Sequence, residues 1–180
     1  MKKNTLLLFA FMMVTALYAQ KYTTKTGNIK FEASMPSFEE VAAENKTASA
    51  VVVGETGDIA VLALMKGFRF KVALMEEHFN ENYVESDKYP KATFKGKIEG
   101  FDVSKVTADG KNYTITGDLT LHGKTKHITD SAKITRQGNT LVITGAFEVV
   151  PADFDIEIPS LVSKKIADKI KVSYTFQLNK

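Results

Sequence analysis

The stretch YTITGDLTLH, residues 113–122, alternates apolar and polar side chains with a period of two. Its odd positions carry tyrosine, isoleucine, glycine and leucine, and its even positions carry threonine, aspartate and histidine. Because successive side chains of a β-strand point to opposite faces, the pattern predicts a strand with one dry face and one solvated face. The same parity recurs over residues 92–99 and 170–178. The sequence therefore indicates an all-β fold built from half-buried strands.

Short turn-forming sequences separate the alternating runs. They are TGN at 26–28, ETGD at 55–58, ADGK at 108–111 and RQGN at 136–139, and such residues tolerate a positive φ in hairpin turns. Candidate strands lie at residues 22–34, 48–55, 58–65, 67–72, 92–99, 112–122, 126–135, 140–149 and 170–178. These nine runs give roughly eight or nine strands, enough to close a single antiparallel β-barrel of about eight strands.

One to three short helices are expected to interrupt the strands. Residues 74–84 place Met75, Phe79 and Tyr83 at spacings of four, which is typical of an amphipathic helix. In residues 159–169, Ser160 is a candidate cap for a helix whose apolar side carries Val162, Ile166 and Ile170. A weaker helical pattern covers residues 37–45. We expect the first two helices to cover the ends of the barrel.

The first 19 residues have the pattern of a signal peptide. Lys2 and Lys3 precede an apolar run at residues 6–17, and Leu-Tyr-Ala-Gln ends the segment. Cleavage after Ala19 would leave residues 20–180 as one domain without a membrane span, located in the periplasm or secreted. An uncleaved anchor is the alternative, but the apolar run is short for a bilayer core of about 30 Å.

Charge and cysteine content narrow the class of protein further. Removal of Lys2 and Lys3 with the signal peptide leaves 22 basic and 21 acidic side chains out of 24 and 21. This balance argues against a nucleic-acid partner, which needs a clustered basic face. The chain has no cysteine, so its core alone must stabilise an exported domain.

The sequence contains no recognisable catalytic or metal motif. The three histidines, His78, His122 and His127, form no HExxH or ExxH pattern, and no GxSxG sequence is present. We therefore predict that the protein is not an enzyme and has no metal site. His122 and Lys124 have polar parity near a strand end. A solvated turn is the favoured interpretation there, and a role in binding a ligand head group is the alternative.

Three acidic residues near the C-terminus also have two interpretations. Asp153, Asp155 and Glu157 alternate with phenylalanine and isoleucine at 154, 156 and 158. We favour a strand with a solvated acidic side over a catalytic pair of carboxylates.

The apolar face leaves open whether the barrel is filled. An eight-stranded barrel is wide enough either to be packed with side chains or to hold one small ligand. Gly96, Gly117 and Gly145 fall on the apolar parity of three strands. They would either leave a slot in the interior or allow the strands to bend.

Two motifs together resemble the YceI-like family of exported bacterial proteins. They are HFNENYVESDKYPKATFKGKI at residues 78–98 and GDLTLHGKTKHI at residues 117–128. A third motif, DFDIEIP at residues 153–159, is similar to the variant of that family familiar from Bacteroidetes-type bacteria. The resemblance covers essentially the whole chain after the predicted signal peptide.

This resemblance implies a lipocalin-like barrel whose apolar lumen holds a polyisoprenoid or a quinone-type lipid. We therefore predict non-catalytic binding of a long apolar or amphiphilic chain, by a carrier or scavenger in the envelope. No cofactor is expected apart from such a bound lipid, and the protein is expected to be a monomer or a homodimer. Apolar chains suit a site without catalytic motifs, because each buried methylene contributes about 0.8 kcal/mol.

Candidate ligand-binding residues follow from strand parity, with the helix at 74–84 closing one end. They are Phe68, Phe70, Met75, Phe79, Tyr83, Phe94, Ile115, Leu119, Ile143 and Phe147. Two other hypotheses remain open from the sequence. One is an envelope stress or structural protein with a packed barrel that binds a partner through its surface. The other is a metal-assisted hydrolase that uses His78 and His122.

Overall fold

The computed structural model describes residues 20–36 and 38–180. The predicted signal peptide, residues 1–19, lies outside the described residues. The elements in chain order are β1 (Lys21–Ser34), β2 (Ala42–Val53), β3 (Asp58–Leu64), η1 (Met65–Gly67), β4 (Arg69–Phe70), α1 (Ala73–His78), η2 (Phe79–Tyr83), β5 (Lys91–Ile98), η3 (Val103–Lys105), β6 (Lys111–Leu121), β7 (Lys124–Gln137), β8 (Thr140–Val149), η4 (Pro151–Phe154), η5 (Ser163–Lys165) and β9 (Ile166–Asn179).

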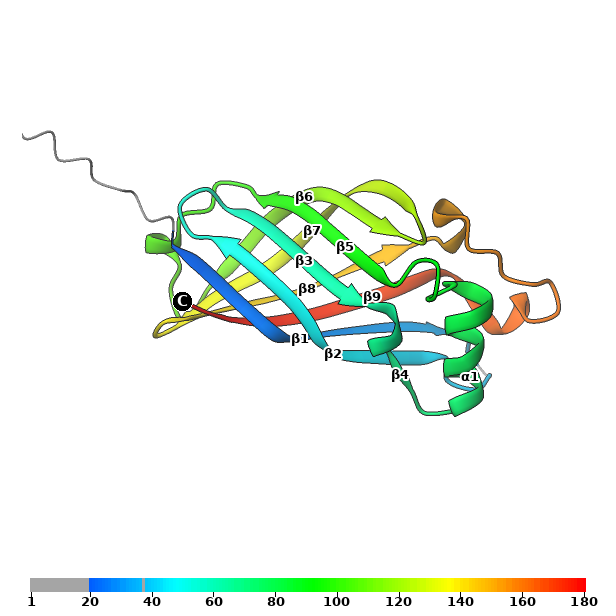
Figure 1. Cartoon of the computed structure of the whole chain (residues 1–180). Coiled ribbons are helices and arrows are strands. Elements are labelled where there is room, and N and C mark those ends of the chain that lie inside the picture. Colours follow the sequence, from blue (N-terminus) through cyan, green and yellow to red (C-terminus); the bar gives the residue numbers. More distant parts are fainter. Residues whose placement is uncertain (1–19, 37) are drawn as a thin grey trace, which may run out of the picture.

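The strands form one closed antiparallel barrel. Their order is β1-β9-β8-β7-β6-β5-β3-β2, and β1 also pairs with β2, which closes a ring of eight. The two-residue strand β4 adds to the edge of β2. Figure 1 shows the barrel with α1 and the segment between β8 and β9 at one end, and the start of β1 and the C-terminus at the other. The predicted all-β barrel of about eight strands is confirmed.

Burial along the strands follows the alternation seen in the sequence. In β6, Tyr113, Ile115 and Gly117 are buried, whereas Thr114 and Asp118 are exposed. Because antiparallel neighbours are paired in register, the inward residues of each strand meet those of the next strand at the same level. The barrel interior is therefore built from layers of apolar side chains.

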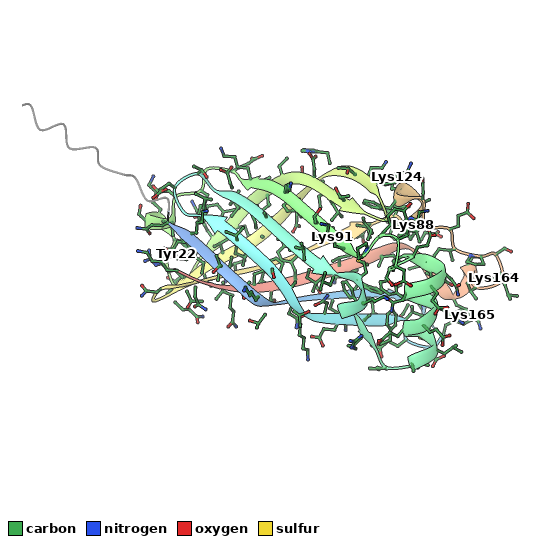
Figure 2. All side chains as sticks on the ribbon, in the orientation of Figure 1. Tyr22, Lys88, Lys91, Lys124, Lys164 and Lys165 are labelled. Atoms are coloured by element: carbon green, nitrogen blue, oxygen red, sulfur yellow. The ribbon has the colours of Figure 1, made fainter. Side chains whose placement is uncertain are left out.

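One end of the barrel is packed solid. The fully or almost fully buried residues Tyr22, Val52, Ile98, Leu141 and Leu178 come from five different strands. They lie near the start of β1 and β8 and near the end of β2, β5 and β9. Figure 2 shows Tyr22 at the barrel end opposite α1. This end supplies the continuous core that a domain without disulfides requires.

The helix predicted at residues 74–84 is present as α1 followed by the π-helical turn η2. The other two helix predictions are wrong. Of residues 159–169, only η5 is helical, and β9 begins at Ile166. Positions 162, 166 and 170 are four apart, but they also share one face of a strand, so the pattern fits both structures.

Residues 37–45 are not helical in the part that the structure describes. The strand β2 begins at Ala42, six residues before its predicted start, and Ala43 pairs with both Phe31 and Phe70. Pairing on two edges overrides the weak helical pattern. Within the described residues, no helix has the length and apolar character needed to cross a membrane.

Candidate ligand-binding cavity

The half of the barrel beneath α1 encloses a cavity of about 550 Å³. Side chains from the barrel strands, α1, η2 and residues 151–166 line it, and most of them are apolar. Ile115 and Phe176, which are almost completely buried, lie next to the packed end. The interior is thus filled at one end and hollow at the other, so a fully packed barrel does not describe this protein.

Four phenylalanines form one wall of the cavity. The ring of Phe31 lies 5.6 Å from that of Phe68, 5.7 Å from that of Phe70 and 5.4 Å from that of Phe79, measured between centroids. The rings of Phe70 and Phe79 are 5.2 Å apart. These tilted and offset arrangements are the ones that aromatic pairs prefer. The cluster joins β1, β4 and η2 beside the hollow.

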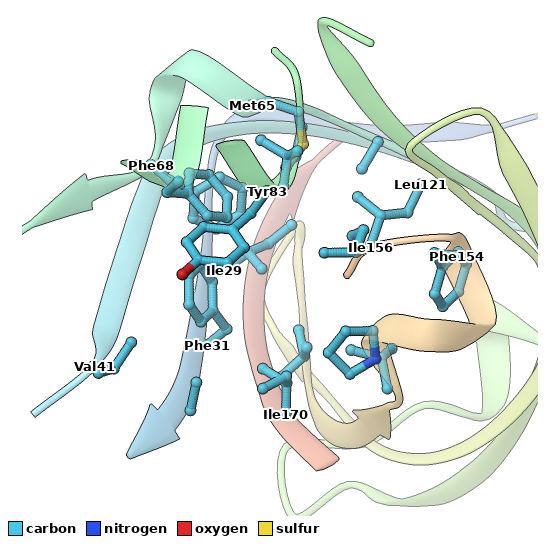
Figure 3. Close-up of a pocket in the computed structure, with 18 of the residues that line it drawn as sticks. Ile29, Phe31, Val41, Met65, Phe68, Tyr83, Leu121, Phe154, Ile156 and Ile170 are labelled. Carbon is cyan, nitrogen blue, oxygen red and sulfur yellow. The ribbon is translucent and has the colours of Figure 1, made fainter. Parts of the chain in front are cut away.

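Aliphatic side chains face this aromatic wall. Figure 3 shows Leu121, Ile156 and Ile170 across open space from Phe31 and Tyr83. They come from β6, from the segment after η4 and from β9. The two facing walls shown in Figure 3 are therefore mainly apolar, and the hydroxyl of Tyr83 is a polar group among these side chains.

The segment that carries the acidic residues 153, 155 and 157 is not a strand, and that prediction is wrong. Residues 151–154 form η4, and Asp155 has a left-handed φ of 53°. The alternation nevertheless separates inward from outward side chains correctly, because Phe154 and Ile156 are buried and Ile158 lines the cavity. A helical turn at Pro151 replaces the expected strand pairing.

The acidic side chains of this segment form ion pairs on the outer surface. Asp153 is 3.3 Å from the amine of Lys126, and Asp155 is 2.8 Å from that of Lys124. All four side chains are about half exposed. They attach η4 and its exit to the start of β7.

Nine of the ten predicted ligand-binding residues line the cavity. They are Phe68, Phe70, Met75, Phe79, Tyr83, Phe94, Ile115, Leu119 and Phe147. The tenth, Ile143, has the same inward parity but pairs with Ile134 at a level where both are fully buried. Ile143 therefore belongs to the packed end. Contact of the nine residues with a ligand stays a prediction.

Neighbouring aromatic rings lie above the three inward glycines. A Cβ at Gly96 or Gly117 would lie 2.7 or 2.8 Å from Cζ of Phe94. A Cβ at Gly145 would lie 2.3 Å from the hydroxyl oxygen of Tyr174. All three distances are shorter than a normal contact, so only glycine leaves room for these rings. The glycines accommodate aromatic side chains and do not leave open slots.

The mouth of the cavity is apolar and exposed. Phe38 and Leu74 line the cavity and are 48% and 56% exposed, and Leu161, beside the lining residue Val162, is 89% exposed. Five lysines lie at the same end of the barrel: Lys88, Lys91, Lys124, Lys164 and Lys165 (Figure 2). The rim thus combines apolar side chains with basic ones.

Glu76 fastens α1 beside the mouth. One of its carboxylate oxygens accepts a hydrogen bond of 2.7 Å from Arg69, and the other accepts one of 3.1 Å from the backbone N–H of Phe70. Both donors belong to β4. The two bonds attach α1, which buries no residue completely, to the strand beside it.

His122 lies in a turn as predicted, but its side chain is only 9% exposed, so the prediction that this turn is solvated is wrong. Its Nδ1 lies 2.9 Å from the carbonyl oxygen of Phe154, and its Nε2 lies 2.8 Å from a carboxylate oxygen of Glu85. The ring packs edge-on against Tyr89 at 4.5 Å. Both ring nitrogens therefore connect parts of the protein to one another. Among residues 20–36 and 38–180, no group of histidine, aspartate and glutamate side chains is arranged to hold a metal ion.

A polar pair that the sequence analysis missed lies at the cavity wall. The hydroxyl of Tyr174 in β9 donates a hydrogen bond of 2.6 Å to Oδ2 of Asp130 in β7, and both residues line the cavity. Burial, followed by the hydrogen bond to Asp130 and its charge, raises the pKa of Tyr174 well above its ordinary value. In the sequence, Asp130 is a charged residue among the inward apolar positions Ile128, Ala132 and Ile134. This break in the apolar pattern could have indicated a polar group in the cavity wall.

Comparison with known proteins identifies the family. The model of the YceI-like domain matches residues 10–178. A UPF0312 protein of Photorhabdus laumondii is 32% identical over 118 residues, which are 65% of this chain and 52% of that protein. Protein YceI of Escherichia coli O157:H7 is 41% identical over 58 residues, 32% of this chain and 27% of that protein. The alignments thus span about half or less of these curated relatives.

Solved structures share the fold at low sequence identity. A polyisoprenoid binding domain from Saccharophagus degradans superposes with a TM-score of 0.74 at 14% identity, over 88% of this chain and 97% of that domain. BcnA of Burkholderia cenocepacia gives a TM-score of 0.71 at 18% identity, over 86% of this chain and 96% of BcnA. The barrel, its sequence motifs and the family match agree, and the chain belongs to the YceI-like family.

Proposed function

We propose that this protein binds a long apolar or amphiphilic molecule, a polyisoprenoid or quinone-type lipid, in its barrel and acts as a non-catalytic carrier or scavenger. The observation that carries the proposal is an apolar cavity of about 550 Å³ inside a closed barrel. Its volume falls within the usual range for small-molecule sites, roughly 300–1,000 Å³. A polyisoprenoid binding domain is among the proteins that share the fold.

The composition of the walls supports a hydrocarbon ligand. One five-carbon isoprene unit would contribute roughly 4 kcal/mol of gross binding free energy, before the entropic cost of ordering the chain. Phe31, Leu119, Leu121 and Ile170 offer only apolar surface to such a unit. Affinity distributed in this way needs few polar contacts, in agreement with a site that has no catalytic motif.

The test is to identify the molecule bound in the barrel and to prevent its binding by filling the cavity. Protein purified from its native envelope should release an apolar molecule on solvent extraction, and native mass spectrometry should show the same mass bound. The variant Leu119→Trp places a large ring in the cavity and should lose most of this loading. The control Leu64→Trp adds the same ring on the outer face of β3, where Leu64 is 54% exposed, and should keep it.

Two results would overturn the proposal. One is repeated recovery of no apolar molecule from the wild-type protein. The other is equal loading of the Leu119→Trp variant and the wild type, which would place the bound molecule outside the cavity.

The carrier role includes location in the periplasm or outside the cell. Its support is the sequence pattern of residues 1–19. The intact mass of protein isolated from osmotic-shock fluid or culture medium should correspond to a chain that begins at Gln20. A full-length chain confined to the cytosol would contradict this part of the proposal.

A further inference from the structure

The barrel wall is interrupted between β7 and β8. These strands pair only from Lys133–Thr144 to Gln137–Thr140. Beyond Lys133, β7 continues to Lys124 with β6 as its partner, and beyond Thr144, β8 continues to Val149 with β9 as its partner. The two strands therefore separate toward the mouth of the barrel, although each stays in the sheet on its other side.

The separation is a window and not an open seam, because η4 closes it on the side of the mouth. The ion pair between Lys126 and Asp153 and the hydrogen bond between His122 and the carbonyl of Phe154 connect η4 to the start of β7 and the turn before it. The window is thus framed by residues 128–131 of β7 and 146–148 of β8.

A surface hollow lies at this window. Thr129, Ser131 and Glu148 are among the exposed residues that line it from outside. Ile128, Asp130 and Phe147 line both this hollow and the main cavity. Three side chains therefore separate the apolar interior from solvent at this point, and one of them is a carboxylate.

Asp130 is held at the window by two hydrogen bonds. Its Oδ2 accepts the bond of 2.6 Å from the hydroxyl of Tyr174, and its Oδ1 accepts one of 2.7 Å from the backbone N–H of Ser131. Gly145 stands between β7 and β9 in the wall, and its missing side chain allows Tyr174 to reach across β8. Each carboxylate oxygen keeps a second lone pair that can accept a hydrogen bond.

We propose that Asp130 and Tyr174 form the binding site for the polar head of the amphiphile, and that this head is a hydrogen-bond donor such as the hydroxyl of a prenyl alcohol. This inference rests on the proposed function. The apolar chain would run from the pair toward the mouth, between the phenylalanine wall and the aliphatic wall. The head would lie at the window, close to solvent, while the chain lies in the dry part of the lumen.

The charge at position 130 determines which heads the site accepts. A hydroxyl can donate to the carboxylate, and a hydrogen bond to an ionised acceptor is stronger than one between neutral groups. A phosphate head has no donor comparable to a hydroxyl at neutral pH and carries negative charge, so it is repelled by Asp130. Near the window, Lys126 is paired with Asp153, and Lys169 is paired with Glu148. The site therefore selects prenyl alcohols over prenyl phosphates.

The experiment compares farnesol with farnesyl phosphate, which share one hydrocarbon chain. Binding of each to protein stripped of lipid is measured by isothermal titration calorimetry for the wild type and for Asp130→Asn. The wild type should bind farnesol more tightly. Asp130→Asn keeps the size of the side chain and should lower the ratio of the two affinities by about ten-fold, the change expected for loss of a charged hydrogen-bond acceptor. The ratio within one variant does not depend on how much of that variant is folded.

Asp118→Asn is the matched control. Asp118 is exposed on the outer face of β6, where it pairs with His127, so its substitution should leave the ratio unchanged. An unchanged ratio in Asp130→Asn, or tighter binding of farnesyl phosphate by the wild type, would overturn the head-group site alone. Absence of binding of either compound to the wild type would overturn the proposed function and the head-group site with it.

Discussion

At Tyr174, burial and a carboxylate act in the same direction on one hydroxyl. Burial and the charge of Asp130 both favour the protonated hydroxyl, which donates its hydrogen bond to Asp130. They therefore raise the pKa of Tyr174. In the unfolded chain the hydroxyl loses its proton near pH 10. The pair therefore stabilises the fold fully below about pH 10, and this contribution is lost as the pH rises from there toward the raised folded value.

This linkage gives a prediction about alkaline pH. The free energy of unfolding of the wild type should fall more steeply than that of Tyr174→Phe between about pH 9 and pH 11, because only the wild type must keep a proton that its unfolded form releases. Urea denaturation at several pH values measures the difference. Parallel curves for wild type and Tyr174→Phe would count against the linkage.

Gly117 in β6 lies very close to the backbone of Gly96 in the neighbouring strand β5. A Cβ there would lie 2.4 Å from both Cα of Gly96 and the carbonyl oxygen of Lys95, and neither backbone atom is free to move. We expect Gly117→Ala to reduce the free energy of unfolding by an amount near the upper end of the usual range for overpacking, about 1–3 kcal/mol. Urea denaturation measures this loss.

The control for this substitution is Gly100→Ala. Gly100 has a φ of 61°, and a Cβ at this position would meet no atom within 4 Å beyond its chain neighbours. Only the backbone strain of a left-handed residue, about 1–2 kcal/mol, therefore applies to this variant. Equal losses for the two variants would mean that the strands β5 and β6 can separate to admit a methyl group.

At the scale of elements, the attachment of α1 to β4 is testable through Glu76. Glu76→Ala removes both bonds to β4 and should cost less than about 1 kcal/mol of stability, because the ion pair is close to solvent. The larger effect should be on motion: amides of α1 and of Phe70 should exchange faster with deuterium, and a bound apolar probe should dissociate faster. Glu77→Ala, on the exposed side of α1, should change neither rate. If the amides of α1 exchange faster in both Glu76→Ala and Glu77→Ala, the two bonds of Glu76 are not what attaches α1 to β4.

Most of the strands and α1 could be predicted because each carries one period over most of its length. The prediction is wrong at positions 162, 166 and 170, because a spacing of four fits one face of a helix and also one face of a strand. It is wrong around Ala43, because pairing with strands on both sides decides the structure there. For the site, parity gave the inward face of each strand and so placed Phe94 and Phe147 correctly at the cavity. It could not reveal the window, because a strand has the same sequence pattern whether or not its neighbour is hydrogen-bonded to it.

The whole molecule divides into a packed end and a hollow end, and stability should divide in the same way. Leu141 is fully buried, and Leu141→Ala should cost about 2–5 kcal/mol through loss of packing and creation of a void. Leu119→Ala should cost roughly half as much, because Leu119 already borders open space. Urea denaturation of the two variants, stripped of lipid, measures the difference. Equal costs would indicate that the hollow end collapses when it is empty.

The position of Phe94 has a consequence for spectroscopy. The tip of its ring, Cζ, lies close to Gly96 and Gly117, and the circulating π electrons of an aromatic ring shift the resonances of nearby nuclei. The α-protons of these two glycines should therefore resonate at unusual frequencies, and a guest that tilts the ring should move them. The protein has no tryptophan whose fluorescence could report on the barrel. The resonances of these glycines would report instead whether the barrel is occupied.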